Sequence, residues 1–150
     1  MDFKISKCSG SDLKQCVPIF IKVYAKSPYN EHWSKNDAVK RLKSVYKGNK
    51  TYCFTAKLDN QVIGFILGRD YQWYDGKRVF LEELVVSEEF RRKGVGTLLW
   101  NAFENRLKSR GVVLVQGLVN SNSTATRFYK KISLGESDYK LFEKKVRRFL

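Results

Sequence analysis

Residues 80–110, FLEELVVSEEFRRKGVGTLLWNAFENRLKSR, decide how this chain folds. The apolar run at 84–86 predicts a buried strand, and the apolar spacing after residue 97 predicts an amphipathic helix. Between them stands the glycine turn, residues 91–97, Arg-Arg-Lys-Gly-Val-Gly-Thr. Backbone N–H groups at a helix start are unpaired and carry partial positive charge, and glycine lets an anion approach closely. The turn is therefore a candidate binding site for phosphate or pyrophosphate.

The glycine turn does not match two common phosphate-binding motifs. Thr97-Leu98 stands where the P-loop needs Lys-Ser/Thr, and Leu99 stands where the dinucleotide fingerprint needs its third glycine. What remains, Arg91-x-x-Gly94-x-Gly96 after a strand, resembles the acetyl-CoA pyrophosphate loop of the GNAT superfamily of N-acetyltransferases. The alternative is a tight strand-to-helix turn with solvated basic residues.

A second motif lies one predicted strand further along the chain. Asn122-x-x-Ala125-x-x-Phe128-Tyr129 is similar to the GNAT pattern N-x-x-A-x-x-F-Y, and the combined resemblance covers about residues 50–147. There are two departures. The sequence Ile-Ser-Leu at 132–134 replaces a frequent Gly-Phe, which predicts a different final turn, and Arg92 stands where glycine is frequent.

Length and composition bound the class of protein. The 150 residues, 43% of them hydrophobic, predict a single domain spanning 1–150. No apolar run approaches 18 residues and the first residues lack a signal-peptide core, so we expect a cytoplasmic protein without a membrane span. Three cysteines without ligand spacing and one histidine predict reduced thiols and no metal site.

The charge is strongly basic, with 29 Lys and Arg against 15 Asp and Glu and a formal net charge of +14. Such an excess predicts polyanions nearby, and one CoA accounts for only part of it. Residues 127–150 carry eight Lys or Arg and three Asp or Glu. They form either a solvated tail or a weak contact with RNA, the ribosome or an acidic protein.

Periodicity predicts an alternation of helices and strands. We expect strands near 3–5, 51–58, 62–67, 80–86, 112–119 and 139–146, and helices at 13–24 (kinked or restarting at Pro18), from Ser34, from the glycine turn to about 111, and at 124–131. Strands 80–86 and 112–119 should be parallel, because one helix connects them. The resemblance implies the α/β (α+β) GNAT fold, a mixed central sheet of about six to seven strands flanked by helices, with splayed central strands.

The resemblance also implies how acetyl-CoA is held. The strand backbone would bind the pantetheine arm, the amides of the glycine turn would bind the pyrophosphate, and Asn122 would contact pantetheine or simply cap the last helix. The implied cofactor-binding residues are Leu84, Val85, Val86, Arg91, Arg92, Lys93, Gly94, Val95, Gly96, Thr97, Asn122 and Tyr129.

Three residues are the catalytic candidates. Tyr129 would protonate the departing thiolate, although it could instead pack beside Phe128. Strand alternation places Glu82 on one face with Leu84 and Val86, and Glu83 on the other. By resemblance we favour Glu82 as general base or amine anchor, with Glu83 second. The alternative is that both carboxylates pair with Arg69, Arg78 or another cation.

Aromatic residues are the candidates for the acceptor site. The stretch 29–33 lies where the resemblance places the substrate roof, and 71–78 lies between strands near the same end. Tyr29, Trp33, Trp73 and Tyr74 would contact the substrate, or else pack in ordinary loops.

These observations predict an N-acetyltransferase that transfers an acetyl group from acetyl-CoA to a primary amine of a small molecule or protein by direct attack. One alternative is a basic RNA- or ribosome-associated binding module on the same fold without catalysis. Another is a CoA binder with a degenerate acceptor site. Homodimers are frequent in the family that the chain resembles.

Overall fold

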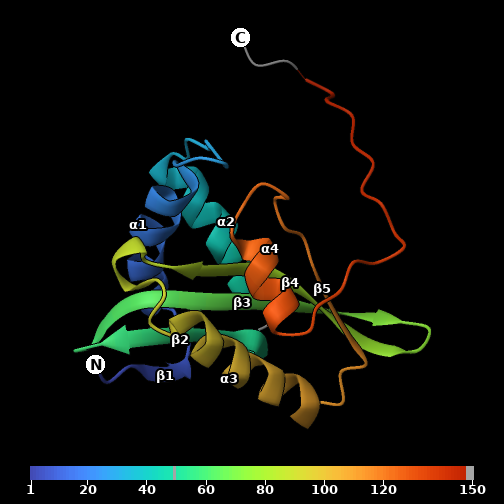
Figure 1. Cartoon of the computed structure of the whole chain (residues 1–150), viewed down its shortest axis with the longest axis horizontal. Coiled ribbons are helices and arrows are strands. Elements are labelled where there is room, and N and C mark those ends of the chain that lie inside the picture. The colour runs from blue at the N-terminus through green and yellow to red at the C-terminus, as the bar shows by residue number, and fades with distance from the viewer. Residues whose placement is uncertain (49, 148–150) are drawn as a thin grey trace.

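The computed structural model describes residues 1–48 and 50–147, and shows a central sheet with helices on both faces (Figure 1). Helices α1 (Asp12–Tyr24) and α2 (Lys35–Gly48) pack together against one face. Helix α3 (Val95–Ser109) packs against the other face, and the short α4 (Ala125–Lys131) follows the last strand. The layered arrangement agrees with the predicted α+β class.

The sheet has five strands in sequential order within the described residues: β1 (Lys4–Lys7), β2 (Cys53–Leu58), β3 (Gln61–Trp73), β4 (Gly76–Val86) and β5 (Leu114–Gly117). Neighbours are antiparallel except β4 and β5, which are parallel as predicted. None of the helices described here is long and apolar enough to cross a bilayer.

In the part of the chain that the structure describes, the strand predicted at 139–146 is absent, and the sheet has five strands instead of six to seven. Residues 139–146 have no regular secondary structure, and their apolar side chains are exposed. A strand needs a hydrogen-bonded neighbour, and in this structure no strand lies beside this segment. Apolar and β-forming residues alone therefore gave a wrong prediction at this place.

Two apolar clusters form the core, one on each face of the sheet. Phe20 of α1 and Leu42 of α2 pack with Phe65 of β3, and Leu99 and Phe103 of α3 pack in the second cluster. This separation follows from strand alternation, because successive side chains of β3 point to opposite faces. The sheet is thus buried on both faces where the helices cover it.

Strands β4 and β5 pair over a short length only. Their register runs from Arg78 opposite Leu114 to Leu81 opposite Gly117, whereas β4 continues to Val86 without a β5 partner. The predicted splay between the central strands is therefore confirmed. It exposes one edge of β4 at residues 82–86, immediately before the glycine turn.

A β-bulge interrupts β4 at the start of this splay. Leu67 pairs with Glu83 but Gly68 pairs with Leu81, so Glu82 is an extra residue on β4. The prediction that Glu82 shares a face with Leu84 and Val86 is wrong for this reason, because the extra residue shifts the alternation. The bulge sits beside Gly68, where an added Cβ would lie 2.7 Å from the ring of Phe103.

The first helix runs through Pro18 as one element, so the predicted restart at Pro18 is not observed. Its start is held by a reciprocal pair of hydrogen bonds. The Asp12 N–H donates to Ser9 Oγ at 3.2 Å, and the Ser9 N–H donates to Asp12 Oδ2 at 2.9 Å. This capping box fixes the entry of α1 onto the sheet.

Candidate active site

The glycine turn connects β4 to α3 in a conformation that depends on left-handed residues. Gly94 is the N-cap of α3 with φ of 83°, and Arg92 also has a positive φ of 60°. The second value explains why glycine is favoured at the position of Arg92. The first amides of α3, from Val95 to Thr97, have no acceptor in a preceding helical turn and are available to an anion.

Two alanine substitutions separate the roles of the glycines. We expect Gly94→Ala to lower the free energy of unfolding by about 1–2 kcal/mol, because a Cβ is unfavourable at this φ even in open space. Gly96→Ala should stay within about 1 kcal/mol of wild type, because alanine has the higher helix propensity and its Cβ would lie 3.4 Å from the Phe128 ring, an ordinary contact distance. Urea unfolding of both variants tests this. Equal losses would contradict the conformational explanation.

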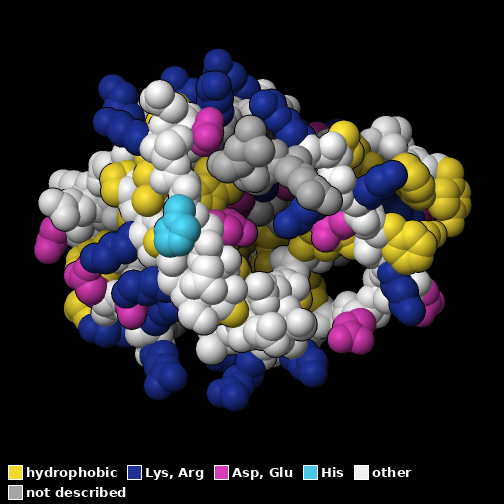
Figure 2. Space-filling view, turned by 90° about the horizontal axis from the view of Figure 1, so that it is seen from above, with side chains coloured by type: hydrophobic (Ala, Val, Ile, Leu, Met, Phe, Trp, Pro, Cys, Tyr) yellow, Lys and Arg dark blue, Asp and Glu magenta, His cyan; other side chains and the backbone are white. Residues whose placement is uncertain are grey.

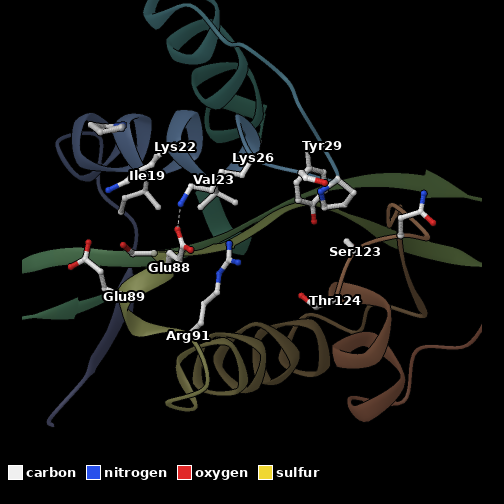
Figure 3. Close-up of a pocket in the computed structure, with 15 residues that line it drawn as sticks. Ile19, Lys22, Val23, Lys26, Tyr29, Glu88, Glu89, Arg91, Ser123 and Thr124 are labelled. Carbon is white, nitrogen blue, oxygen red and sulfur yellow. Dashed lines mark hydrogen bonds and ion pairs between the residues drawn. The ribbon is translucent and has the colours of Figure 1, made fainter.

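A groove of about 740 Å³ opens next to the glycine turn (Figure 3). Its walls are the C-terminal half of α1, the turn after β4 and the loop before α4. The lining includes Ile19, Lys22, Val23, Lys26, Tyr29, Glu88, Arg91, Asn122 and Thr124. The groove thus joins the end of the splayed strand to the two sequence motifs.

Lys22 and Lys26 are functional candidates that sequence reasoning missed. Lys22 lies in the last turn of α1 and Lys26 lies just after the helix ends at Tyr24; both line the groove, with Arg91 across it. Lys26 forms an ion pair with Glu88, which links α1 to the turn after β4. The i, i+4 spacing was visible in the sequence, but nothing in the sequence showed that this face of α1 meets residues 88–91.

Asn122 lines the groove and does not cap α4. The N-cap of α4 is Thr124, and the Asn122 N–H donates to Asn120 Oδ1 at 2.9 Å. The alternative that Asn122 is a plain N-cap is therefore wrong. Its position in the groove is compatible with the predicted contact to a ligand.

The two carboxylates of the bulge lie in one ion-pair network. Arg69 donates to Glu82 Oε2 at 2.6 and 3.2 Å, and Arg41 of α2 donates to Glu82 Oε1 at 3.3 Å. Arg41 also donates to Glu83 Oε2 at 3.1 Å, while the Tyr24 hydroxyl donates to Glu83 Oε1 at 2.9 Å. Both carboxylates therefore pair with cations, as the alternative interpretation predicted. Arg78 is not among them, because it pairs with Asp75.

Glu83 is the more buried carboxylate and the one linked to the tyrosines. Burial raises the pKa of Glu83, and Arg41 and Tyr24 partly offset that rise. Burial raises the pKa of Tyr129 to about 12, and the charges of Glu83 and Tyr29 add to the effect. Tyr129 also lies against β5, because its ring is 3.8 Å from the Cβ position of Gly117. The charge of Glu83 therefore contributes to the raised pKa of Tyr129.

The aromatic candidates are not all brought together. Tyr29 lines the groove and packs edge-to-face on Tyr24 at 4.8 Å between ring centroids. Trp33 packs on Phe20 at 4.9 Å and does not line the groove. Trp73 and Tyr74 lie at the β3–β4 turn, also outside the groove lining. Of the four aromatic candidates, Tyr29 is thus the one that lines the groove.

A mixed sheet with splayed central strands, a glycine turn starting a helix at the splay, and a tyrosine from the following helix define a class of acyl-transferring proteins. The chain belongs to that class: the model of the acetyltransferase (GNAT) family matches residues 19–134. The predicted family is therefore confirmed, and with it the fold.

Individual relatives agree with this assignment. An uncharacterized N-acetyltransferase of Methanocaldococcus jannaschii is 26% identical over 141 residues, which is 91% of this chain but 62% of the relative's length. A crystal structure from Clostridium difficile 630, described as a possible acetyltransferase, has a TM-score of 0.81 at 18% identity, covering 97% of this chain and 99% of the other. Aminoglycoside N-acetyltransferase AAC(6')-Iy in complex with CoA has a TM-score of 0.77 at 17% identity, covering 97% and 96%.

Proposed function

We propose that the protein transfers an acetyl group from acetyl-CoA to a primary amine by direct attack. The observation that carries this proposal is that the end of β4 without a β5 partner leads into the glycine turn, beside a groove lined by Arg91 and Asn122. Glu83 lies on the same part of β4, and its charge contributes to the raised pKa of Tyr129. The CoA bound to the structurally similar AAC(6')-Iy supports the choice of cofactor.

The cofactor would bind along the free edge of β4. The backbone of Leu84 and Val86 has no β5 partner and would hydrogen-bond the pantetheine arm as a strand does. The amides of the glycine turn would hold the pyrophosphate. Arg91, Lys22 and Lys26 would neutralise phosphate charge, because all three line the groove. Asn122 would contact the ligand from the opposite wall.

Glu83 and Tyr129 would move the two protons of the reaction. The amine arrives protonated and must lose a proton before its nitrogen forms the new bond to the acetyl carbon. Glu83 would accept that proton, directly or through water. As the carbon–sulfur bond breaks, Tyr129 would donate its proton to the sulfur, and its raised pKa keeps the phenol protonated at neutral pH. We thus place the base role on Glu83, with Glu82 holding Arg41 and Arg69.

The ion pairs of Glu82 and Glu83 indicate how many positive charges the acceptor carries. Glu82 and Glu83 are matched by Arg41 and Arg69, so they do not form an acidic pocket for a polycation. Glu31 is exposed and accepts a hydrogen bond from Trp33. We therefore favour an acceptor with a single amine, on a small molecule or a protein. A screen of amines by thiol release identifies it.

The distribution of basic residues bears on the binding-module alternative. Figure 2 shows Lys and Arg side chains spread around the rim of the face viewed from above, instead of gathered in one patch. A dedicated nucleic-acid site would require such a patch. Contact between residues 127–150 and a polyanion stays a prediction, and the last three of these residues lie outside the described part of the chain.

Cofactor binding is tested by thermal unfolding with acetyl-CoA. At 100 times the dissociation constant, binding to the native state should add about 2.7 kcal/mol to the free energy of unfolding and raise Tm. The double variant Lys22→Ser/Lys26→Ser should need more ligand for the same rise. Lys14→Ser, an exposed α1 lysine outside the groove, is the matched control. No rise at saturating acetyl-CoA would refute the cofactor assignment.

A further inference from the structure

Tyr24, the last residue of α1, contacts the buried carboxylate of β4 from outside both sequence motifs. Its hydroxyl donates to Glu83 Oε1 at 2.9 Å. The ring is held on two sides, because its centroid lies 4.9 Å from that of Phe20 and 4.8 Å from that of Tyr29. Close packing of this kind leaves the phenol little freedom to turn away. The hydroxyl therefore meets Glu83 from one fixed direction.

The two oxygens of the Glu83 carboxylate have partners of different kinds. Oε1 accepts the hydrogen bond from Tyr24, and Oε2 accepts one from Arg41 Nε at 3.1 Å. A guanidinium can only donate, whereas a phenol hydroxyl can donate or accept. Glu83 is 7% exposed, so water has little access to either oxygen. The partner at each oxygen thus decides what that oxygen can do when the carboxylate takes a proton.

Protonation suits the partner at Oε1 and not the partner at Oε2. A buried O–H group is destabilising unless it finds an acceptor. At Oε2 the new hydrogen would meet the N–H groups of Arg41. At Oε1 the Tyr24 hydroxyl can rotate about its C–O bond and accept a hydrogen bond where it donated one before. Tyr24 can therefore stabilise both protonation states of the carboxyl group.

Charged and titratable side chains approach Glu83 from several elements. They are Tyr24 of α1, Arg41 of α2, the neighbouring Glu82, Arg69 of β3 through its ion pair with Glu82, and Tyr129 of α4, whose pKa the charge of Glu83 raises. Burial raises the pKa of Glu83 most and Glu82 adds to the rise, whereas Arg41 and Tyr24 lower it. Of these groups, Arg41 and Tyr24 bond Glu83 directly, and Tyr24 is the one that can change from donor to acceptor.

We propose that Tyr24 is a positioning residue for acetyl transfer, which orients the Glu83 carboxylate and directs the proton of the amine to Oε1. This inference rests on the proposed function, in which Glu83 is the base. The N–H bond of the ammonium breaks as an O–H bond forms at Oε1, and the freed lone pair of the nitrogen attacks the acetyl carbon. Tyr24 keeps its own proton, because burial and the charge of Glu83 raise the pKa of its phenol.

Tyr24→Phe tests this role through the pH profile of kcat. The substitution keeps the ring that packs on Phe20 and Tyr29 but removes the hydroxyl. The carboxylate loses a charge-assisted hydrogen bond, so the pKa of Glu83 should rise and the acidic limb should move to higher pH. Above that limb kcat should remain about 10-fold below wild type, the loss expected for one hydrogen bond to a charged group. The dissociation constant for acetyl-CoA should not change.

The matched control is Tyr46→Phe. It removes the hydroxyl of a buried tyrosine in the same apolar cluster, on α2. The pH profile and kcat of this variant should equal those of wild type. A Tyr24→Phe profile that matches the control would overturn the proposal.

NMR measures the pKa of Glu83 without an acceptor and without turnover. The protein is labelled with carbon-13 at the glutamate carboxyl carbons, and the Glu83 resonance is identified by its absence from Glu83→Gln. Its titration midpoint should be higher in Tyr24→Phe than in wild type, and Tyr46→Phe should match wild type. Equal midpoints in all three proteins would overturn the proposal.

The two measurements together separate this proposal from the proposed function. A raised midpoint with an unmoved kinetic limb would overturn the base role of Glu83, and with it the role of Tyr24 in the reaction. An unmoved midpoint, with the acidic limb still lost in Glu83→Gln, would overturn the role of Tyr24 alone and leave Glu83 as the base.

Discussion

Glu83→Gln should lower kcat by about 10²- to 10⁴-fold while leaving acetyl-CoA affinity unchanged, because general base catalysis contributes that much. Glutamine keeps the shape of the side chain and can still accept the hydrogen bond from Tyr24. It cannot take the proton of the amine. Steady-state kinetics together with acetyl-CoA titration measure the two effects separately.

The pH dependence gives this variant a second measurement. The pKa of Glu83 is raised above its ordinary 4.5, so the wild-type rate should fall as pH drops through the raised value and Glu83 becomes protonated. Glu83→Gln should lack this acidic limb. Glu82→Gln is the matched control on the adjacent residue and should keep it. A Glu83→Gln enzyme as active as wild type would return the base role to Glu82 or to water.

Arg41→Gln should lower the free energy of unfolding by about 3 kcal/mol at pH 7, the low end for a broken buried ion pair, since Arg41 retains some exposure. Arg41 contacts both bulge carboxylates from α2, and its loss leaves the buried Glu83 with Tyr24 alone. Denaturant unfolding measures the change. Arg69→Gln is the matched control: Arg69 is more exposed, and among the described residues its ion-pair partner is Glu82 and not the buried Glu83, so we expect about 1 kcal/mol or less.

The sign of the pH effect on stability follows from Glu83. Without Arg41, the pKa of Glu83 in the folded state rises further above 4.5. Between the unfolded and the folded pKa of Glu83, the folded state then binds more protons than the unfolded state. The free energy of unfolding therefore falls as pH rises through that range. The loss of unfolding free energy in Arg41→Gln should be small below pH 4.5 and should reach its full size above the raised pKa of Glu83 in the folded state. A loss that does not change with pH would show that Arg41 acts by packing alone.

Local signals made much of the fold predictable. The glycine turn, α3 and the parallel β5 follow from short stretches in which periodicity, glycine position and helix start agree. The hairpin of β2 and β3 follows from Asp59-Asn60 between two runs of β-forming residues. These elements needed no information from distant parts of the chain.

Features that depend on long-range contacts were not predictable. The bulge at Glu82 arises from the pairing of β4 with β3, and the sequence of β4 alone does not predict it. Tyr24 and Arg41 reach Glu83 from 59 and 42 residues away in sequence, outside both motifs. Segment 139–146 has the composition of a strand, but composition does not supply the partner that a strand needs.

The contact between Gly68 and Phe103 joins the bulge of β4 to helix α3. Gly68 lies beside the bulge that carries the carboxylates, and Phe103 belongs to the helix whose first turn would grip the pyrophosphate. A single missing methyl group lets that helix settle directly on the sheet. The spacing between the proposed proton acceptor and the proposed phosphate-binding turn is consequently set by contact in the interior and does not depend on the conformation of a loop.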